Sequence, residues 1–303
     1  MKAITAAGVR KSYKNGKETV EALKPVSFEI DKGELFGFIG PDGAGKTTLF
    51  RILVTLLLAD EGTVTVDGYD VVKDYDQIRK RAGYMPGRFS LYQDLSVEEN
   101  LNFYATIFRT TVKENYHLIK DIYSQLEPFA KRPAGKLSGG MKQKLALSCA
   151  LIHKPSVLFL DEPTTGVDAV SRKEFWEMLK RLKDQGITIL VSTPYMDEAS
   201  LCDRVALMQD GRFLKTDTPK NIISNFSQPL LAVKGQDMYE LLHQLKALEV
   251  VDNAYPFGEY HHAVLKTQLY DETALKQQLS TVQQLEIKTA IPDIEDCFIY
   301  EMR

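Results

Sequence analysis

The first third of the chain alternates short apolar runs with turn residues. Asp31-Lys32-Gly33 and Asp67-Gly68 bound these runs, and such punctuation is typical of β-strands. We therefore expect strands at 26–30 (VSFEI), 34–40 (ELFGFIG) and 63–66 (TVTV). The run TTLFRILVTLLL, 47–58, is long and continuously apolar, which predicts a helix packed against the sheet.

The middle of the chain predicts the rest of an α/β domain. Residues 96–130 carry helical spacing and indicate an all-helical insert. The apolar, unalternating runs 156–163 and 187–193 indicate two buried strands. Between them, 171–186 predicts a helix that ends at Gly186. Its apolar face holds Phe175, Trp176, Met178, Leu179 and Leu182. Strands that alternate with helices predict an α/β sheet covered on both faces.

The C-terminal part has a different pattern, in which strand, helix, strand and helix signals follow one another. We therefore predict two domains, 1–222 and 223–303, the second a small α+β appendage. A helical subdomain is expected within the first domain, at about 88–155. The pair His261-His262 has no third ligand at a useful spacing, so a solvated strand or turn is expected there rather than a metal site.

Composition narrows the classes of function. A net charge of −3 and a pI near 6.0 provide no broad basic field, which argues against nucleic-acid binding. Cys149, Cys202 and Cys297 are far apart and odd in number, so we expect core positions in a reducing compartment. The longest aliphatic stretch, 52–59, is far shorter than the roughly 20 residues that span a bilayer. A membrane process would therefore be served from the cytoplasmic side, through a separate membrane partner.

A glycine-rich motif, GPDGAGKTT, begins at the end of the expected strand 34–40 and leads into the expected helix 47–58. This context supports a G-x-x-x-x-G-K-[ST] phosphate-binding loop (P-loop). Its glycines allow a tight turn that directs backbone N–H groups at phosphates, and the helix N-terminus adds a favourable dipole. Lys46 is expected to reach the β- and γ-phosphates, and the Thr47 hydroxyl to ligate Mg²⁺. The predicted nucleotide contacts are Gly40, Pro41, Asp42, Gly43, Ala44, Gly45, Lys46, Thr47 and Thr48.

Two acidic residues end the buried strand 156–163, in the pattern of a Walker B strand. Asp161 is placed to hold Mg²⁺ through water. Glu162 is placed to polarise the attacking water as general base. The alternative is that both are solvated acids at a strand end. The presence of a phosphate-binding loop in the same chain disfavours this alternative.

The segment LSGGMKQ, 137–143, resembles the signature motif of ABC ATPases. With the phosphate-binding loop before it and the Walker B strand after it, the resemblance covers residues 1–215. It implies a P-loop NTPase fold with an antiparallel β subdomain and a helical subdomain. In this family Ser138, Gly139 and Gly140 would close over ATP held by another subunit, which implies a head-to-tail dimer with two ATP molecules between the subunits.

Further positions follow from the same resemblance. Tyr13 falls where ABC proteins stack an aromatic ring on adenine, with Val20 as a candidate to pack under the same ring. A strand-end tyrosine without a ligand is the alternative. Asp168, in Gly166-Val167-Asp168, matches the D-loop, which touches the opposite subunit.

Two positions depart from the family pattern. A glutamine normally follows the YMP triplet of the Q-loop, where this chain has Gly87, and a switch histidine is expected where it has Pro194. Proline has neither a side-chain donor nor a backbone N–H, so it cannot sense the γ-phosphate by a hydrogen bond. Losing one or two such contacts commonly costs about 10²–10³ in rate. We therefore expect slow hydrolysis at this chain's own phosphate-binding loop and a better site on the partner's.

These motifs together resemble the N-terminal half of tandem-ATPase, drug-efflux, type-2 ABC exporters. The tail PDIEDCFIYEM, 292–302, resembles the ending of such ATPases. The resemblance implies ATP and Mg²⁺ as cofactors, permease subunits as partners, and a peripheral position on the cytoplasmic face of the inner membrane. A second ATPase chain would complete a heterodimer, with a homodimer as the alternative.

The same resemblance places a permease contact on the segment 88–108. A groove there would receive a helix of the permease. Its candidate residues are Phe89, Leu91, Tyr92, Phe103 and Tyr104. Ordinary core packing explains these residues equally well.

Two other functions fit the same motifs. A non-transport ABC ATPase of the translation or repair type would show a second ATPase domain or a long coiled-coil insert, and the sequence shows neither. A regulatory partner that binds ATP with negligible turnover is supported only by Gly87 and Pro194.

Overall fold

The computed structural model describes residues 1–16, 18–267 and 272–302. Within them the chain forms two compact units, Met1–Pro219 and Lys220–Glu301. The helix α7 (Pro219–Ser224) begins at this division, and the predicted boundary at 222 falls inside it. Lys17, residues 268–271 and Arg303 of the predicted domains lie outside the described residues.

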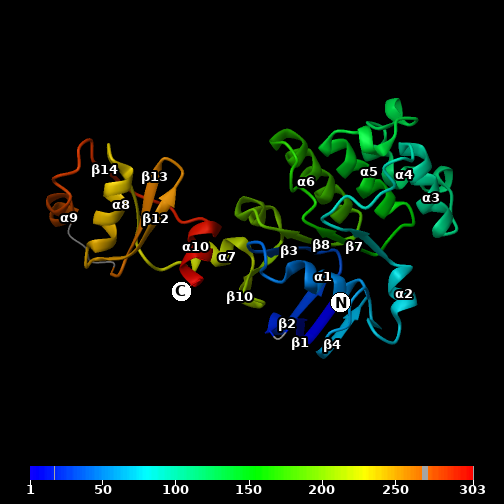
Figure 1. The fold of residues 1–303 in the computed structure, drawn as a ribbon, viewed down its shortest axis with the longest axis horizontal. Helices are drawn as coiled ribbons and strands as arrows, with labels where there is room; N and C mark the ends of the chain where they lie inside the picture. The colour runs from blue at the N-terminus through cyan, green and yellow to red at the C-terminus, as the bar shows by residue number, and fades with distance from the viewer. Residues whose placement is uncertain (17, 268–271, 303) are drawn as a thin grey trace. The chain divides into compact units, whose positions relative to one another are not determined.

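A mixed six-stranded sheet forms the centre of the first unit (Figure 1). Its order is β10-β9-β3-β8-β7-β6, and all neighbours are parallel except β9 and β10. The strands are β3 (Leu35–Ile39), β6 (Ala82–Met85), β7 (Val157–Asp161), β8 (Thr188–Thr193), β9 (Arg204–Gln209) and β10 (Arg212–Asp217). Every residue of β3, β7 and β8 is buried, as expected for strands covered on both faces. The predicted α/β class is confirmed.

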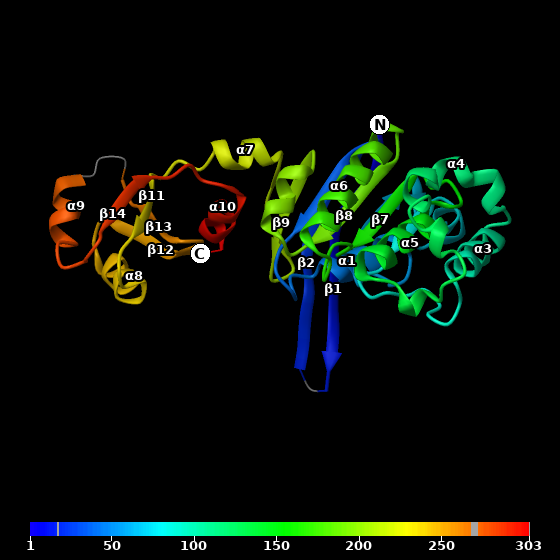
Figure 2. The same ribbon diagram turned by 90° about the horizontal axis from the view of Figure 1, so that it is seen from above.

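An antiparallel sheet covers one face of the centre, together with α1 (Lys46–Leu53). Its order is β2-β1-β4-β5, from β1 (Lys2–Asn15), β2 (Glu18–Asp31), β4 (Glu61–Val66) and β5 (Tyr69–Asp70). Figure 2 shows the β1–β2 hairpin extending beyond the central sheet. Phe38 of β3 packs edge-on against Phe28 of β2 and Phe50 of α1, so three layers share one core.

Helices form the other side of the unit (Figure 1). They are α3 (Val97–Ile107), α4 (Val112–Tyr123), α5 (Gly139–Leu151) and α6 (Ala169–Asp184), whereas the short α2 (Tyr75–Arg79) contacts β5 and β6 and shares the core of the antiparallel sheet. Capping boxes start α3 and α4, with Ser96 and Glu99 in the first and Thr111 and Glu114 in the second. The helices α3 to α5 lie within the range expected for the helical subdomain.

The expected helix 47–58 is shorter in the structure. Helix α1 ends at Leu53, and Thr55 takes a left-handed backbone with φ 64°. The N–H groups of Leu56 and Leu57 both donate to the carbonyl of Arg51, which turns the chain out of the helix. A β-branched residue rarely adopts this conformation, so composition alone does not reveal the stop. Leu56 is consequently 60% exposed instead of packed on the sheet.

The second unit is an antiparallel sheet with helices on both faces. The sheet order is β12-β13-β11-β14, and more elements are present than the strand-helix-strand-helix pattern predicted. They are β11 (Leu230–Lys234), α8 (Met238–Ala247), β12 (Val251–Phe257), β13 (Tyr260–Leu265), α9 (Glu272–Gln278), β14 (Glu286–Thr289) and α10 (Ile294–Glu301). Leu241 of α8 and Leu275 of α9 share one core, while Tyr300 of α10 packs on the opposite face.

The expectation of solvated histidines at 261–262 is wrong. Both lie on β13 and are buried, because the strand is covered on both faces. His262 Nδ1 lies 2.6 Å from Asp296 Oδ1, and Tyr255 donates to the same oxygen at 2.7 Å. His261 Nε2 lies 2.6 Å from the carbonyl oxygen of Met238. Within the described ranges no group of three His, Cys, Asp or Glu side chains could hold a metal ion.

Asp296 is the fully buried acid of the tail segment and ties α10 to the sheet. Burial acts to raise its pKa, but hydrogen bonds from His262, the Asp293 backbone and Tyr255 outweigh burial and lower the pKa. The stabilisation is therefore present above the unfolded pKa, about 3.9, and is lost as pH falls through the lower folded pKa. Asp296 anchors the tail.

Asp296→Asn is expected to destabilise the second unit by about 2–4 kcal/mol. The amide cannot accept all three hydrogen bonds, and one donor is left facing another. Urea unfolding followed by circular dichroism measures the loss. The control is Glu295→Gln, an exposed neighbour expected to change stability by less than about 0.5 kcal/mol. Equal effects of the two substitutions would contradict the anchoring role.

Cys149, Cys202 and Cys297 are buried, as predicted, and form no disulfide among the described residues. Burial raises the pKa of the thiols of Cys149 and Cys202, which keeps them protonated. In the described parts of the chain, no helix combines the length and the apolar character needed to cross a membrane.

Candidate active site

The P-loop joins β3 to α1, and two of its glycines, Gly40 and Gly45, stand where side chains would collide. A Cβ at Gly40 would lie 2.0 Å from the carbonyl oxygen of Met208, and one at Gly45 would lie 2.5 Å from that of Ala22. Gly45 also has φ 100°, which favours glycine. The Gly40 N–H donates to the carbonyl of Thr193, so the loop begins beside the end of β8. This loop geometry leaves the N-terminus of α1 accessible, so that its backbone N–H groups can bind an anion.

Lys46 lies inside the P-loop and is 3% exposed. Its Nζ donates to the carbonyl oxygens of Gly40 and Pro41 at 2.7 and 2.9 Å. The same ammonium lies 3.3 Å from Glu162 Oε1. The cation predicted to bind phosphate and the carboxylate predicted to act as base are therefore ion-paired to each other. Phosphate oxygens would compete with Glu162 for Lys46.

Asp161 ends β7 and is 2% exposed. Its Oδ1 accepts hydrogen bonds from Thr47 Oγ1 at 3.2 Å and from Ser192 Oγ at 2.6 Å. The structure thus brings together the two predicted Mg²⁺ ligands from segments far apart in the chain. A hydroxyl and a carboxylate are oxygen donors that suit Mg²⁺.

Glu162 has an unusual backbone. Its φ is 50°, in the left-handed region that costs a non-glycine residue of order 1–3 kcal/mol. Ser192 helps to hold this conformation, because both its carbonyl oxygen and its Oγ accept from the Glu162 N–H at 3.0 Å. The strain turns the side chain of Glu162 toward the cavity above the P-loop, which it lines.

That cavity has a volume of about 500 Å³. Its walls are Ala22, Asp42, Gly43, Ala44, Gly45, Lys46, Thr47, Thr48 and Glu162. Tyr13 lies beside it, with its hydroxyl 3.4 Å from Thr48 Oγ1 and its side chain 37% exposed. Val20 pairs with Tyr13 across the β1–β2 hairpin and is 52% exposed. An exposed aromatic ring beside the cavity suits stacking on a planar base.

The signature residues do not line this cavity. Ser138 caps α5 and accepts a hydrogen bond from the Met141 N–H at 3.4 Å. Ser138 and Gly139 are exposed, whereas a Cβ on Gly140 would lie 2.7 Å from Ser171 Oγ of α6. Asp168 caps α6 by accepting from the Ser171 N–H at 3.0 Å. The two exposed helix starts are thus packed together.

The departures from the family pattern lie beside the acidic pair. A Cβ on Gly87 would lie 3.0 Å from the Asp161 carbonyl oxygen and 3.7 Å from Glu162 Cβ. Pro194 follows Thr193, the residue whose carbonyl accepts from the Gly40 N–H. A glutamine at position 87 would therefore extend its side chain from a point next to Asp161 and Glu162. Gly87 places no side chain there.

Two residues of this region were not predicted. Ser192 joins Asp161 and Glu162, as described above. Glu198 is 1% exposed and accepts hydrogen bonds from Thr164 and Thr193 at 2.8 and 2.5 Å. An isolated serine in a strand and an acid after a turn carry no local signal, because their partners lie in other segments.

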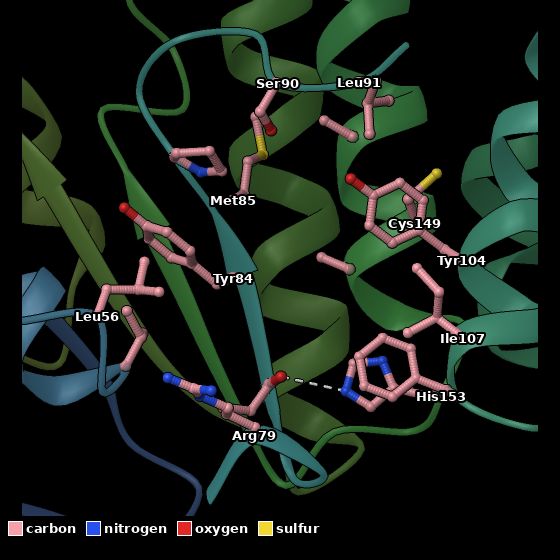
Figure 3. A pocket seen from close by; sticks show the side chains of 16 residues that line it. Leu56, Arg79, Tyr84, Met85, Ser90, Leu91, Tyr104, Ile107, Cys149 and His153 are labelled. Carbon is pink, nitrogen blue, oxygen red and sulfur yellow. Dashed lines mark hydrogen bonds between the residues drawn. The ribbon is translucent and has the colours of Figure 1, made fainter. Parts of the chain in front are cut away.

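A second cavity, of about 510 Å³, lies between β6 and the helices α3 and α5 (Figure 3). Leu91 and Tyr104 of the predicted groove line it. Phe89 instead lies 5.4 Å from the Lys142 ammonium, and Tyr92 packs edge-on against Phe103 outside the lining. The groove prediction thus falls partly on this cavity and partly on neighbouring contacts.

Comparison with known proteins identifies the family. The family model for ABC transporter matches residues 23–165. Over 301 residues the chain is 34% identical to the Nod factor export ATP-binding protein I of Rhizobium sp. (strain N33), covering 98% of this chain and 96% of that protein. The chain belongs to the ABC transporter ATP-binding proteins. This ABC protein is also 38% identical, over 300 residues, to the probable multidrug ABC transporter ATP-binding protein YbhF of Escherichia coli (strain K12).

The match to YbhF covers 98% of this chain and 51% of the relative, so the chain spans about half the length of that protein. Among solved structures, the fold is similar to the dimeric ATP-binding cassette MJ0796 in a post-hydrolysis state bound to ADP and Pi. That similarity has a TM-score of 0.65 and 28% identity, and covers 71% of this chain and 98% of the cassette. The predicted resemblance and the P-loop fold are confirmed. ATP as ligand, with Mg²⁺, and the ATPase class follow from family membership.

Proposed function

We propose that this chain is the ATP-binding subunit of an ABC exporter, hydrolysing Mg-ATP at a dimer interface to drive a separate permease. The carrying observation is that Lys46, Thr47 and Glu162 line one cavity, with Asp161 hydrogen-bonded to Thr47 beside it. Similarity over nearly the whole chain to an export ATP-binding protein supports the direction of transport. The subunit would lie on the cytoplasmic face of the inner membrane, held there by the permease.

Each residue has a role in this proposal. The P-loop N–H groups and Lys46 bind the β- and γ-phosphates, and Thr47 and Asp161 hold Mg²⁺, which neutralises phosphate charge when bound. Glu162 exchanges its ion pair with Lys46 for the attacking water and orients that water as general base. Tyr13 stacks on the adenine. Ser138, Gly139, Gly140 and Asp168 face the partner's nucleotide.

The site on this P-loop is proposed to turn over slowly. Gly87 offers no side chain beside Asp161, and Pro194 offers no donor after β8. The exposed signature start at Ser138 is intact and serves the partner. The working unit is therefore a heterodimer with a second ATPase that carries the glutamine and the histidine. The permease docks at the cavity between β6, α3 and α5.

Pro194→His tests the slow site. We expect the purified wild-type chain to bind Mg-ATP with weak turnover, and the histidine to raise turnover by about tenfold or more through a contact to the γ-phosphate. Phosphate release at saturating Mg-ATP measures the rate. The matched control is Pro25→His, which makes the same proline-to-histidine change at an exposed position of β2. This variant should leave the rate unchanged.

A second ATPase that carries the Q-loop glutamine and the switch histidine should restore turnover when added to the wild-type chain. Vigorous hydrolysis by the isolated wild-type chain, abolished by Glu162→Gln, would reject the asymmetric site. An unchanged rate in Pro194→His would show that the proline does not limit turnover. Absence of Mg-ATP binding would reject the proposed function itself.

A further inference from the structure

Glu198 is a buried carboxylate that does not reach the cavity above the P-loop. It is 1% exposed and lies outside the lining of that cavity. Its Oε1 accepts from Thr164 Oγ1 at 2.8 Å, and its Oε2 accepts from Thr193 Oγ1 at 2.5 Å. Both threonines are buried as well. Glu198 therefore joins the turn that follows β7 to the end of β8.

The turn after β7 runs from the proposed general base to the start of α6. Thr164 lies two residues after Glu162, and the N–H of Thr165 donates to the Glu162 carbonyl oxygen at 3.3 Å. The N–H of Val167 donates to the Thr164 carbonyl oxygen at 3.2 Å, and Asp168 then caps α6. A shift of Thr164 would therefore move the backbone that carries Glu162.

The turn after β8 is bound to the same carboxylate and to the P-loop. The Thr193 hydroxyl that donates to Glu198 also accepts from the Tyr195 N–H at 3.1 Å. The Thr193 carbonyl oxygen accepts from the Gly40 N–H at 3.2 Å. Pro194 has no N–H to donate, so the contacts of its two neighbours fix its place in the turn.

Arg172 connects α6 to the turn after β8. Its Nη2 donates to Asp197 at 2.7 Å, and its Nε lies 3.7 Å from Glu198 Oε1. Its Cζ lies 5.0 Å from the ring centroid of Tyr195. Burying a carboxylate costs free energy, and apolar residues of similar volume often stabilise such a site as well or better. We therefore look to geometry, and not to stability, for the role of this acid.

We propose that Glu198 is a positioning residue for ATP hydrolysis, which keeps the turn after β7 and the turn after β8 in one register. This register sets where Glu162 stands relative to the P-loop, and a small displacement of a reacting group lowers a rate by a large factor. ATP binding depends instead on Lys46 and the P-loop backbone, which form no hydrogen bond with Glu198 in the described part of the chain. The inference rests on the proposed function.

Glu198→Gln should lower the single-turnover rate of ATP hydrolysis about tenfold or more, while the dissociation constant of Mg-ATP stays within about twofold of the wild-type value. Glutamine keeps the volume and one acceptor, but it lacks the second acceptor and the charge that faces Arg172. The full chain, in excess over radiolabelled ATP, gives the rate, and isothermal titration gives the affinity. The matched control is Glu177→Gln, at an exposed position of α6, which should change neither.

Thr164 provides a second test, which decides the question if Glu198→Gln does not fold. Thr164→Val keeps the shape but removes the hydroxyl, and should slow hydrolysis about tenfold, whereas Thr164→Ser keeps the hydroxyl and should stay within about threefold of the wild-type rate. Combining Thr164→Val with Glu198→Gln should slow hydrolysis no further than the slower single change, because both break the same contact. Urea unfolding verifies that each variant is folded at the temperature of the rate measurement.

Four results would overturn the proposal. They are a wild-type rate in folded Glu198→Gln, a loss confined to Mg-ATP affinity, a Thr164→Ser rate as low as that of Thr164→Val, and additive effects in the double variant. The wild-type chain is measured in the same series. If it neither binds nor hydrolyses Mg-ATP, the proposed function fails. If it hydrolyses Mg-ATP and Glu198→Gln does so equally fast, only the inference fails.

Discussion

Glu162→Gln is expected to lower ATP hydrolysis by this chain about 10²–10⁴-fold while Mg-ATP stays bound. The amide keeps the shape of the side chain but cannot accept a proton from the attacking water. Its loss of charge also frees Lys46, which lies 3.3 Å from Glu162 Oε1. ATP affinity should therefore rise, because phosphate no longer competes with a carboxylate for that ammonium.

Single-turnover hydrolysis and equilibrium binding, measured on the same preparation, separate the two effects. Glu259→Gln removes an exposed carboxylate in the second unit and serves as the isosteric control. Hydrolysis by Glu162→Gln at the wild-type rate would remove Glu162 from the role of base. A weaker ATP affinity in that variant would contradict competition for Lys46.

Lys46→Met is expected to weaken ATP binding by about 10²–10³-fold. Methionine keeps much of the length of the stem but removes the charge-assisted bonds to the β- and γ-phosphates, which together contribute about 3–4 kcal/mol. The P-loop backbone would persist, because Gly40, Gly45 and their neighbours are held by backbone contacts. Isothermal titration with Mg-ATP measures the affinity.

The control for this variant is Lys113→Met, an exposed position on α4 that should bind ATP as the wild-type chain does. Circular dichroism verifies that both variants are folded. A dissociation constant for Lys46→Met within twofold of the wild-type value would show that Lys46 does not bind phosphate. Since Glu162 is part-exposed, the loss of its partner should not unfold the site.

Local chemistry explains why the nucleotide site could be predicted. Gly40 and Gly45 are needed because carbonyl oxygens of Met208 and Ala22 crowd them, and Lys46 follows at a spacing that the loop geometry requires. A contiguous motif of this kind can be recognised from its own residues, without knowledge of which distant segments pack against it. The stacking role of Tyr13 was predicted only through the family resemblance, because a single aromatic residue in a strand has no specific pattern; the structure places its hydroxyl 3.4 Å from Thr48 Oγ1.

The incorrect expectations share one physical cause. The end of α1 depends on the strained backbone of Thr55, and the burial of His261 and His262 depends on sheet faces covered by distant segments. Asp296, the partner of His262, lies in the tail. Apolar periodicity reports which side of an element is buried, and it does not report which polar groups meet from distant segments.

The sequence by itself determined the alternation of strands and helices, the P-loop, the acidic pair Asp161 and Glu162, and the departures at Gly87 and Pro194. These features reside in contiguous residues, whose spacing and backbone requirements are local. Only the tertiary structure decided that Lys46 pairs with Glu162, that Ser192 joins the acidic pair, and that His262 meets Asp296 of the tail. Those contacts join segments far apart in the chain, and the packing of the sheets and helices alone brings them within bonding distance.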